Sequence, residues 1–274
     1  MIEFCLLALL GVLLGAFGTL VGTGGGFLLV PILLLLYPET PPDTITAMSL
    51  FVVFTNAASG TVAYWRQGRI DLLTGGLFAL ATLPGAVAGA ILVGYIPRHL
   101  FNVTFAAALG GIGGWLLLSR TSTAIRAPLT GRSVLRRRIT DRSGNTYVYG
   151  YRLWQGLAIS AVVGFVSSLL GIGGGIVHVP VMVVMLRFPV YVATATSQFV
   201  LALMALAATL VHFADGMLSW NGVLARAAAI AAGAIIGAQV GAYCSHRVRG
   251  DTILRALGAA LIIVAARLLW VARS

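Results

Sequence analysis

The chain has 274 residues, of which 59% are hydrophobic and only 9% are charged, and its formal net charge is +11. A soluble domain usually carries charge on roughly a quarter of its residues, so this composition excludes an ordinary soluble domain and indicates a protein whose solvent is the bilayer. The basic excess does not call for a nucleic-acid partner, because arginines that set the orientation of a membrane protein already explain it.

The first apolar run, from Phe4 to Leu36, contains the glycine-rich stretch GTGGGFLLVP at Gly22 to Pro31. The residues from Phe27 to Tyr37 would rise only about 16 Å as a helix, roughly half of the hydrocarbon core. We therefore expect the chain to enter the membrane, unwind at the glycines and return to the side from which it came. Irregular backbone at this depth is tolerated only inside protein or against water, which places the glycines at the centre of the molecule.

Three charge-free runs follow, each long enough to span a membrane as a helix. They are Thr44 to Trp65, Leu72 to Ile96 and Leu100 to Ser119. Residues 1–119 form the first predicted repeat.

Residues 120–152 are the one polar segment of the chain, with Arg136, Arg137 and Arg138 in a row and a turn predicted from Asp141 to Asn145. We interpret this segment as a cytoplasmic linker whose arginines lie against anionic lipid. A regulatory or partner-binding role is the alternative.

Residues 153–274 repeat the first unit. The stretch GIGGGIVHVP at Gly171 to Pro180 copies the first glycine-rich stretch, and Ser197 then matches Ser49 as Gly233 matches Gly85. Because three spans follow each broken hairpin, an odd number of crossings inverts the second unit relative to the first. The predicted fold is an all-α integral membrane protein with two inverted-topology repeats, each a broken re-entrant helical hairpin plus three transmembrane helices.

The basic residues indicate the orientation. All 18 are arginine, and most of them fall on the side of residues 120–152. Since positive charge accumulates in cytoplasmic loops, the linker is predicted to be cytoplasmic and both termini outside.

The two glycine stretches are the predicted substrate site. Successive backbone N–H groups can form an anion-binding nest, and a short helix that starts there presents the positive end of its dipole. The glycines proposed to bind substrate are Gly24, Gly25, Gly26, Gly173, Gly174 and Gly175. The alternative is that they serve close helix packing. No Asp, Glu, Lys or Arg lies in the core of a predicted span, so an anion would be held by dipoles and neutral donors.

Few polar side chains lie at this level. The candidates for substrate binding are Thr23, Ser49, Asn56, Ser197 and Gln198.

Three further residues have two interpretations each. His178 is either a neutral packing residue or a group with a proton or substrate role. Tyr64 and Arg66 are either an interfacial anchor or a gate. No metal site, cofactor or enzymatic centre is predicted, because the spans hold neither a buried carboxylate nor a reactive cysteine.

These stretches, the segments ITAMSLF at Ile45 to Phe51 and ATATSQF at Ala193 to Phe199, and YWRQGRID at Tyr64 to Asp71 resemble the TauE/SafE family of sulfite and organosulfonate exporters. The resemblance implies a bacterial inner-membrane transporter that exports sulfite, sulfoacetate or related sulfonates. We expect it to work by alternating access. An anion channel, or a transporter of another small anion such as a carboxylate, is the alternative. The glycine-rich helix faces fit internal packing and a homodimer equally well.

Overall fold

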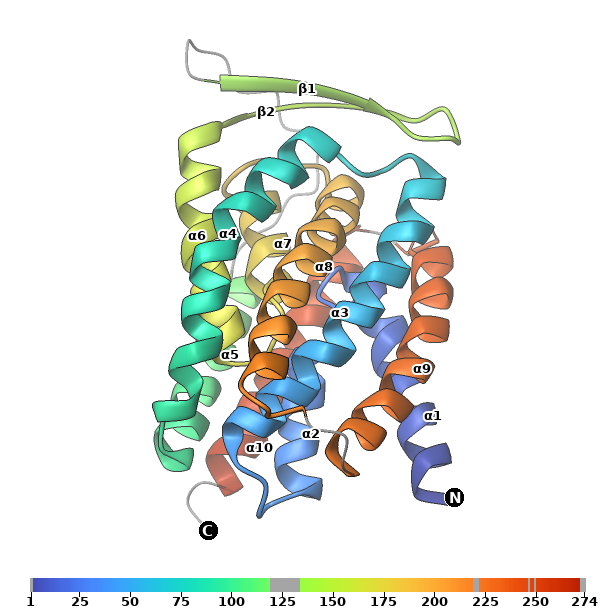
Figure 1. The fold of residues 1–274 in the computed structure, drawn as a ribbon. Helices are drawn as coiled ribbons and strands as arrows, with labels where there is room; N and C mark the ends of the chain where they lie inside the picture. Colours follow the sequence, from blue (N-terminus) through green and yellow to red (C-terminus); the bar gives the residue numbers. More distant parts are fainter. Residues whose placement is uncertain (1, 119–133, 219–221, 246, 249, 272–274) are drawn as a thin grey trace.

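The computed structural model describes residues 2–118, 134–218, 222–245, 247–248 and 250–271. The first half comprises α1 (Ile2–Val21), α2 (Gly26–Leu36), α3 (Pro42–Gln67), α4 (Leu72–Leu92), the 3₁₀ turn η1 (Val93–Tyr95) and α5 (Arg98–Leu118). The second half comprises α6 (Leu153–Leu169), α7 (Gly175–Val184), α8 (Val190–Ala214), α9 (Gly222–Cys244) and α10 (Gly250–Val271). Between the halves lie β1 (Val134–Thr140) and β2 (Thr146–Arg152). Figure 1 shows the helices as one bundle with the strands across one end, here called the hairpin end.

Both glycine-rich stretches interrupt helices, as the sequence predicts. Helix α1 ends at Val21 and α2 begins at Gly26, while α6 ends at Leu169 and α7 begins at Gly175. With 11 and 10 residues, α2 and α7 reach about 16 and 15 Å, too short to cross a bilayer alone.

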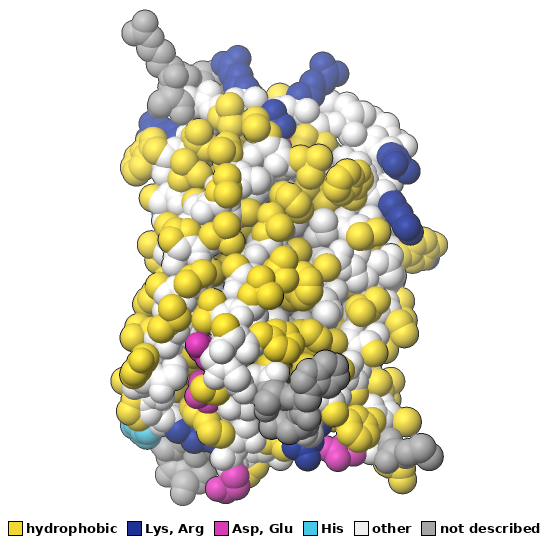
Figure 2. All heavy atoms as spheres, in the orientation of Figure 1, with side chains coloured by type: hydrophobic (Ala, Val, Ile, Leu, Met, Phe, Trp, Pro, Cys, Tyr) yellow, Lys and Arg dark blue, Asp and Glu magenta, His cyan; other side chains and the backbone are white. Residues whose placement is uncertain are grey.

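Five of the described helices are long and apolar enough to cross a membrane: α1, α3, α4, α8 and α9. Figure 2 shows hydrophobic side chains spread over the flank of the bundle, and several arginines at the hairpin end. The chain is therefore a multi-pass membrane protein.

Glycines allow the helices to approach closely. Helix α1 packs along α9, α6 along α4, α3 along α8 and α5 along α10. A Cβ added to Gly233 would lie 1.9 Å from the carbonyl oxygen of Ala8, and one added to Gly85 would lie 2.5 Å from that of Ala161. These glycines serve packing, as small residues do between membrane helices.

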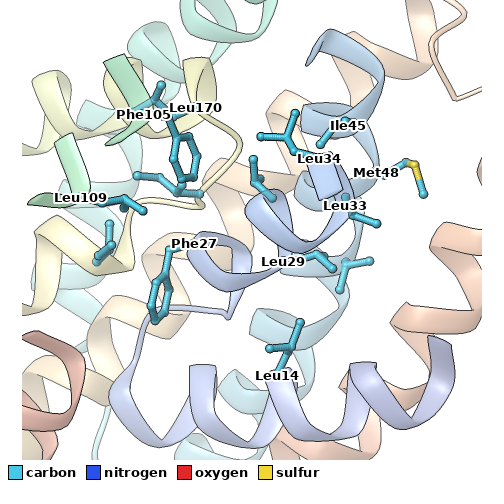
Figure 3. Close-up of a cluster of buried hydrophobic side chains, with 14 of the residues drawn as sticks. Leu14, Phe27, Leu29, Leu33, Leu34, Ile45, Met48, Phe105, Leu109 and Leu170 are labelled. Atoms are coloured by element: carbon cyan, nitrogen blue, oxygen red, sulfur yellow. The ribbon is translucent and has the colours of Figure 1, made fainter. Parts of the chain in front are cut away.

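Short helix α2 is enclosed by protein. Phe27, Leu29 and Leu33 are at most 1% exposed. Figure 3 shows them among side chains of neighbouring helices, including Leu14 of α1 and Phe105 of α5. The broken hairpin is thus part of the core, which shields its unwound backbone from lipid.

The predicted linker contains an unpredicted β-hairpin, so the all-α expectation applies only to the two halves. Strands β1 and β2 pair antiparallel around the turn predicted from the sequence, where the amide of Asp141 donates to the carbonyl of Asn145 at 2.9 Å. The turn is confirmed, and Gly144 supplies its left-handed residue with φ 86°. Residues 120–133 of the predicted linker lie outside the described residues.

Candidate functional site: the paired glycine loops

Left-handed glycines turn the chain back on itself in each loop. In the first loop φ is 83° at Gly22, 73° at Gly24 and 81° at Gly25; in the second it is 67° at Gly171, 70° at Gly173 and 56° at Gly174. Side chains of L-residues rarely tolerate these angles, which explains why both reversals are built from glycine.

The two loops lie against each other. A Cβ on Gly26 would lie 2.9 Å from the carbonyl oxygens of Gly171 and Ile172, and a Cβ on Gly175 would lie 2.4 Å from the carbonyl oxygen of Gly22. Gly26 and Gly175 thus serve close packing of the loops, because any larger residue would separate them; their proposed contact with substrate stays a prediction.

Two serines join the halves across this contact. Ser49 of α3 donates a hydrogen bond to the carbonyl of Gly171 at 2.7 Å, and Ser197 of α8 donates one to the carbonyl of Gly22 at 3.1 Å. Each serine thus holds the loop of the other half. The structure places both at the loops as predicted, with their hydroxyl protons bound to backbone.

The backbone amides differ in part from the predicted nest. The N–H of Thr23 and the N–H of Gly24 both donate to the carbonyl of Gly18, and the N–H of Gly22 donates to that of Thr19. The Thr23 hydroxyl also donates to Gly18, at 3.4 Å. These donors close the end of α1, so they are not the free anion donors that the sequence suggested.

Apolar side chains line the middle of the loops. A Cβ on Gly24 would meet Leu201 at 2.5 Å and Val53 at 3.1 Å, and one on Gly173 would meet Val53 at 2.4 Å. One on Gly174 would meet Met204 at 3.3 Å. The loop glycines are thus held between α3 and α8.

Two buried amides beside the loops lack partners. The Asn56 Oδ1 accepts a hydrogen bond from the Thr19 hydroxyl at 3.2 Å, but its Nδ2 has no partner, and neither Nε2 nor Oε1 of Gln198 has one. Both side chains are 0% exposed. A Cβ on Gly60 would lie 3.3 Å from the Thr19 hydroxyl and 3.4 Å from the Gln198 amide carbon, so these residues surround one point between α1, α3 and α8.

An unpaired buried polar group costs about 1–3 kcal/mol, and native structures seldom leave one without a reason. The amides of Asn56 and Gln198 are the strongest indication of a ligand among the predicted site residues.

The remaining candidate residues, His178, Tyr64 and Arg66, either have protein partners or lie on the surface. The His178 Nε2 lies 3.0 Å from the Ser160 hydroxyl, and the ring centroid lies 5.5 Å from that of Phe78, so His178 already has partners on α6 and α4. Tyr64 is buried and donates to the carbonyl of Thr19 at 2.8 Å, which ties α3 to the end of α1. Arg66 lies on the surface.

A buried carboxylate that the site prediction omitted attaches the hairpin to the bundle. Asp71 caps the N-terminus of α4, and both of its oxygens accept hydrogen bonds from Arg137 of β1, at 2.7 and 2.9 Å. Tyr149 and Thr74 each donate a further bond at 2.6 Å. The amide of Asp71 donates to the Thr196 hydroxyl at 3.0 Å, so the cap also contacts α8 beside Ser197. Arg137 therefore points into the protein instead of toward lipid.

Burial and hydrogen-bond partners act in opposite directions on the pKa of Asp71. Burial alone would raise the pKa of the carboxyl, but the hydrogen bonds from Arg137, Thr74 and Tyr149 outweigh burial and hold the pKa below its ordinary value. Burial also raises the pKa of Tyr149, so its phenol stays a donor.

A second ion pair lies nearby. The Arg69 Nε is 3.8 Å from the Asp141 Oδ2 in the hairpin turn, and the Arg69 guanidinium lies 5.4 Å from the ring centroid of Tyr191. The amide of Arg142 donates to the carbonyl of Gln67 at 3.0 Å. Arg69 and Asp71 belong to the YWRQGRID segment, whose role at the hairpin could not be recognised without the partners.

Comparison with known proteins identifies a transporter family. The family model described as sulfite exporter TauE/SafE matches residues 7–268. The probable membrane transporter protein YunE of Bacillus subtilis is 31% identical over 98% of both chains. A probable membrane transporter protein of Xylella fastidiosa is 26% identical over 92% of this chain and 89% of its own. No solved structure matches the chain.

Proposed function

The chain belongs to the sulfite exporter TauE/SafE family of membrane transporters, and we propose that it exports small sulfur-containing anions such as sulfite, sulfoacetate or related organosulfonates. The observation that supports this most is the pair of unpaired amides, Asn56 and Gln198, beside the two unwound loops. Sulfonyl oxygens are hydrogen-bond acceptors, and the amide nitrogens can donate to them. Short helices α2 and α7 add the positive ends of their dipoles.

The transporter is proposed to be two inverted repeats in the bacterial inner membrane, with the hairpin cytoplasmic and both termini outside. Two observations support this. The helix pair α1 and α9 corresponds to α6 and α4 when the halves are exchanged. In Figure 1 the N-terminus and the far end of α10 lie at the end of the bundle opposite the hairpin.

Alternating access would move one half against the other at the loops. The bonds from Ser49 to Gly171 and from Ser197 to Gly22 join the halves, so they are the contacts that must change when the site turns to the other side. With a negative cell interior, each negative charge that leaves gains about 2.3 kcal/mol per 100 mV, so export needs no coupled ion.

Efflux from proteoliposomes tests this proposal. Vesicles loaded in turn with sulfite, sulfoacetate, sulfate and a matched carboxylate are compared at membrane potentials of both signs, with wild type and Gln198→Leu. We expect saturable, potential-driven efflux of a sulfur anion through wild-type protein, and slower efflux of the same anion through Gln198→Leu. A preference for the carboxylate would move the substrate to that class, and non-saturating flux at channel rates would favour an anion channel.

A further inference from the structure

A groove opens on the outer surface of the bundle, where α6 begins and α7 ends. Its volume of about 440 Å³ lies within the range of small-molecule sites, and the residues that line it are Trp154, Gln155, Ala158, Ile159, Met185 and Leu186. Trp154 is 62% exposed and Met185 is 55% exposed, so the groove faces the surroundings of the bundle. None of the six residues belongs to the paired glycine loops, which makes this a separate site.

The groove lies at the hairpin end. Strand β2 ends at Arg152 and α6 begins at the next residue, directly below β2 in Figure 1. At the other wall, Phe188 follows Leu186 by two residues, and its ring centroid lies 4.4 Å from that of Tyr149 in β2. An exposed tryptophan in the first turn of an apolar helix, next to a polar hairpin, is typical of the level of the lipid headgroups.

Below the groove the same face of α6 is apolar. Trp154, Ala158 and Val162 recur every four residues and are all exposed, so they form one stripe along the helix. Helix α6 contains no charged residue. The stripe leads about 12 Å away from the hairpin, which is the path that an acyl chain takes from a headgroup into the hydrocarbon.

Two arginines flank the groove without protein partners. Arg152 immediately precedes α6 and Arg187 immediately follows Leu186, and both arginines are exposed. In the part of the chain that the structure describes, neither side chain makes a hydrogen bond or an ion pair. The buried acids of the hairpin end are already bound by other arginines. Two uncompensated positive charges therefore lie at headgroup level, where each attracts the phosphate of an anionic lipid.

The backbone of Arg187 is also unusual. Its φ is 61°, and among the described residues it is the only one besides glycines with a positive φ. The amide of Phe188 donates to the carbonyl of Met182 at 2.8 Å, which closes the end of α7 around Arg187. Glycine is the usual left-handed residue at a helix end of this kind, because it has no side chain to clash. An arginine there costs stability, which favours a role for its side chain.

We infer that this groove binds an anionic phospholipid. The phosphate lies at Arg152 and Arg187, the Gln155 amide donates to oxygens of the headgroup region, and one acyl chain follows the stripe on α6. Charge complementarity favours a lipid over a second copy of this chain, since an isologous contact would bring both arginine pairs to one interface. The inference goes beyond the proposed function and does not depend on which anion is transported.

Thermal unfolding of the full-length protein in detergent tests the lipid class. Dioleoylphosphatidylglycerol and dioleoylphosphatidylcholine have the same acyl chains and a phosphate, but only the first has a net negative charge. At about ten times its Kd, phosphatidylglycerol should raise the melting temperature by about 3–6 °C, and phosphatidylcholine by less than half as much. Equal shifts, or no shift with either lipid, would overturn the inference. The same shift with soluble glycerol phosphate would also overturn it, because that anion has no acyl chain.

Native mass spectrometry measures the affinity of charge variants for phosphatidylglycerol. Arg187→Gly and Arg152→Gln should each lower it about fivefold. Arg187→Gly should not lower the melting temperature without lipid, since glycine accepts the left-handed conformation, and this separates lost binding from lost folding. The control is Arg138→Gln, which should stay within about twofold of wild type. Arg138 pairs with Val148, four residues from Arg152 along β2, so it lies about 13 Å away, beyond the reach of screened charge. Equal losses in all three variants would contradict a defined site.

A bulky residue tests the groove itself. Ala158→Trp leaves both arginines in place but fills the groove, so it should lower the affinity for phosphatidylglycerol at least about tenfold. The control Ala107→Trp places the same side chain at an exposed position of α5. Unchanged lipid binding in Ala158→Trp would overturn the inference. A wild-type dimer that binds no lipid and that Ala158→Trp separates would assign the groove to a second copy and would overturn it as well.

Discussion

Removal of the Arg137 guanidinium is expected to detach the β-hairpin from the bundle. The Asp71 side chain is 0% exposed, while that of Arg137 is 28% exposed. Loss of one partner of a buried ion pair costs roughly 3–5 kcal/mol, because the other charge stays buried without compensation. Tyr149 and Thr74 still donate to Asp71 in Arg137→Gln, so we expect the lower part of this range, about 3 kcal/mol. For a chain of this size that lowers the melting temperature by roughly 6–12 °C.

Thermal unfolding in detergent and limited trypsin digestion measure this effect. The matched control is Arg138→Gln, because Arg138 is the next residue of β1 and is exposed. The double variant Asp71→Asn with Arg137→Gln should regain part of the lost stability, since it no longer buries a lone charge. If Arg137→Gln melts and digests like Arg138→Gln, the ion pair does not hold the hairpin and the reasoning is wrong.

Three further predictions concern the loops and the hairpin. Gly26→Ala should prevent the loops from meeting and reduce folded protein and transport, whereas Gly76→Ala, where an added Cβ meets nothing within 4 Å, should behave as wild type in expression and efflux assays. Ser49→Ala and Ser197→Ala should each cost about 1 kcal/mol in thermal unfolding, because each removes one hydrogen bond between the halves; unchanged melting would show that these bonds carry no stability. The pKa of Asp71 is lowered by folding, so its stabilising contribution is complete above its ordinary pKa and is lost as the pH falls through the folded value. The melting-temperature difference between wild type and Asp71→Asn should therefore shrink on acidification, and a difference that grows would contradict this sign.

The broken hairpins could be predicted because their signal is local. Three consecutive glycines followed by an apolar run too short to cross the membrane leave few backbone solutions, and α2 and α7 have the expected lengths. The turn at Asp141 to Asn145 could be predicted for the same reason, since aspartate and glycine each favour turns through local effects.

The strands of the hairpin could not be predicted from the composition of this segment. Arg136, Arg137 and Arg138 form an unbroken polar run, and the two-residue alternation appears only when Arg137 faces the buried Asp71 while its neighbours face outward. An ion pair between residues 66 positions apart leaves no local trace in one sequence.

The position of the candidate residues near the loops could be predicted from the sequence, but their hydrogen bonding could not. Ser49, Ser197, Asn56 and Gln198 all lie near the loops, but only the structure shows that the serine hydroxyls hold backbone while the amides are unpaired. The N–H groups of Thr23 and Gly24 both donate to the carbonyl of Gly18 near the end of α1. This bonding depends on how the helix ends, which the glycine pattern does not specify.

The location of a bound anion tests the central claim most directly. A structure determined with bromomethanesulfonate, whose bromine marks the ligand by anomalous scattering, should show one peak beside the paired loops, with the sulfonate within hydrogen-bond distance of Asn56 Nδ2 and Gln198 Nε2. The peak should be absent in Gln198→Leu. A peak only at the exposed arginines of the hairpin end, unchanged in that variant, would contradict the account.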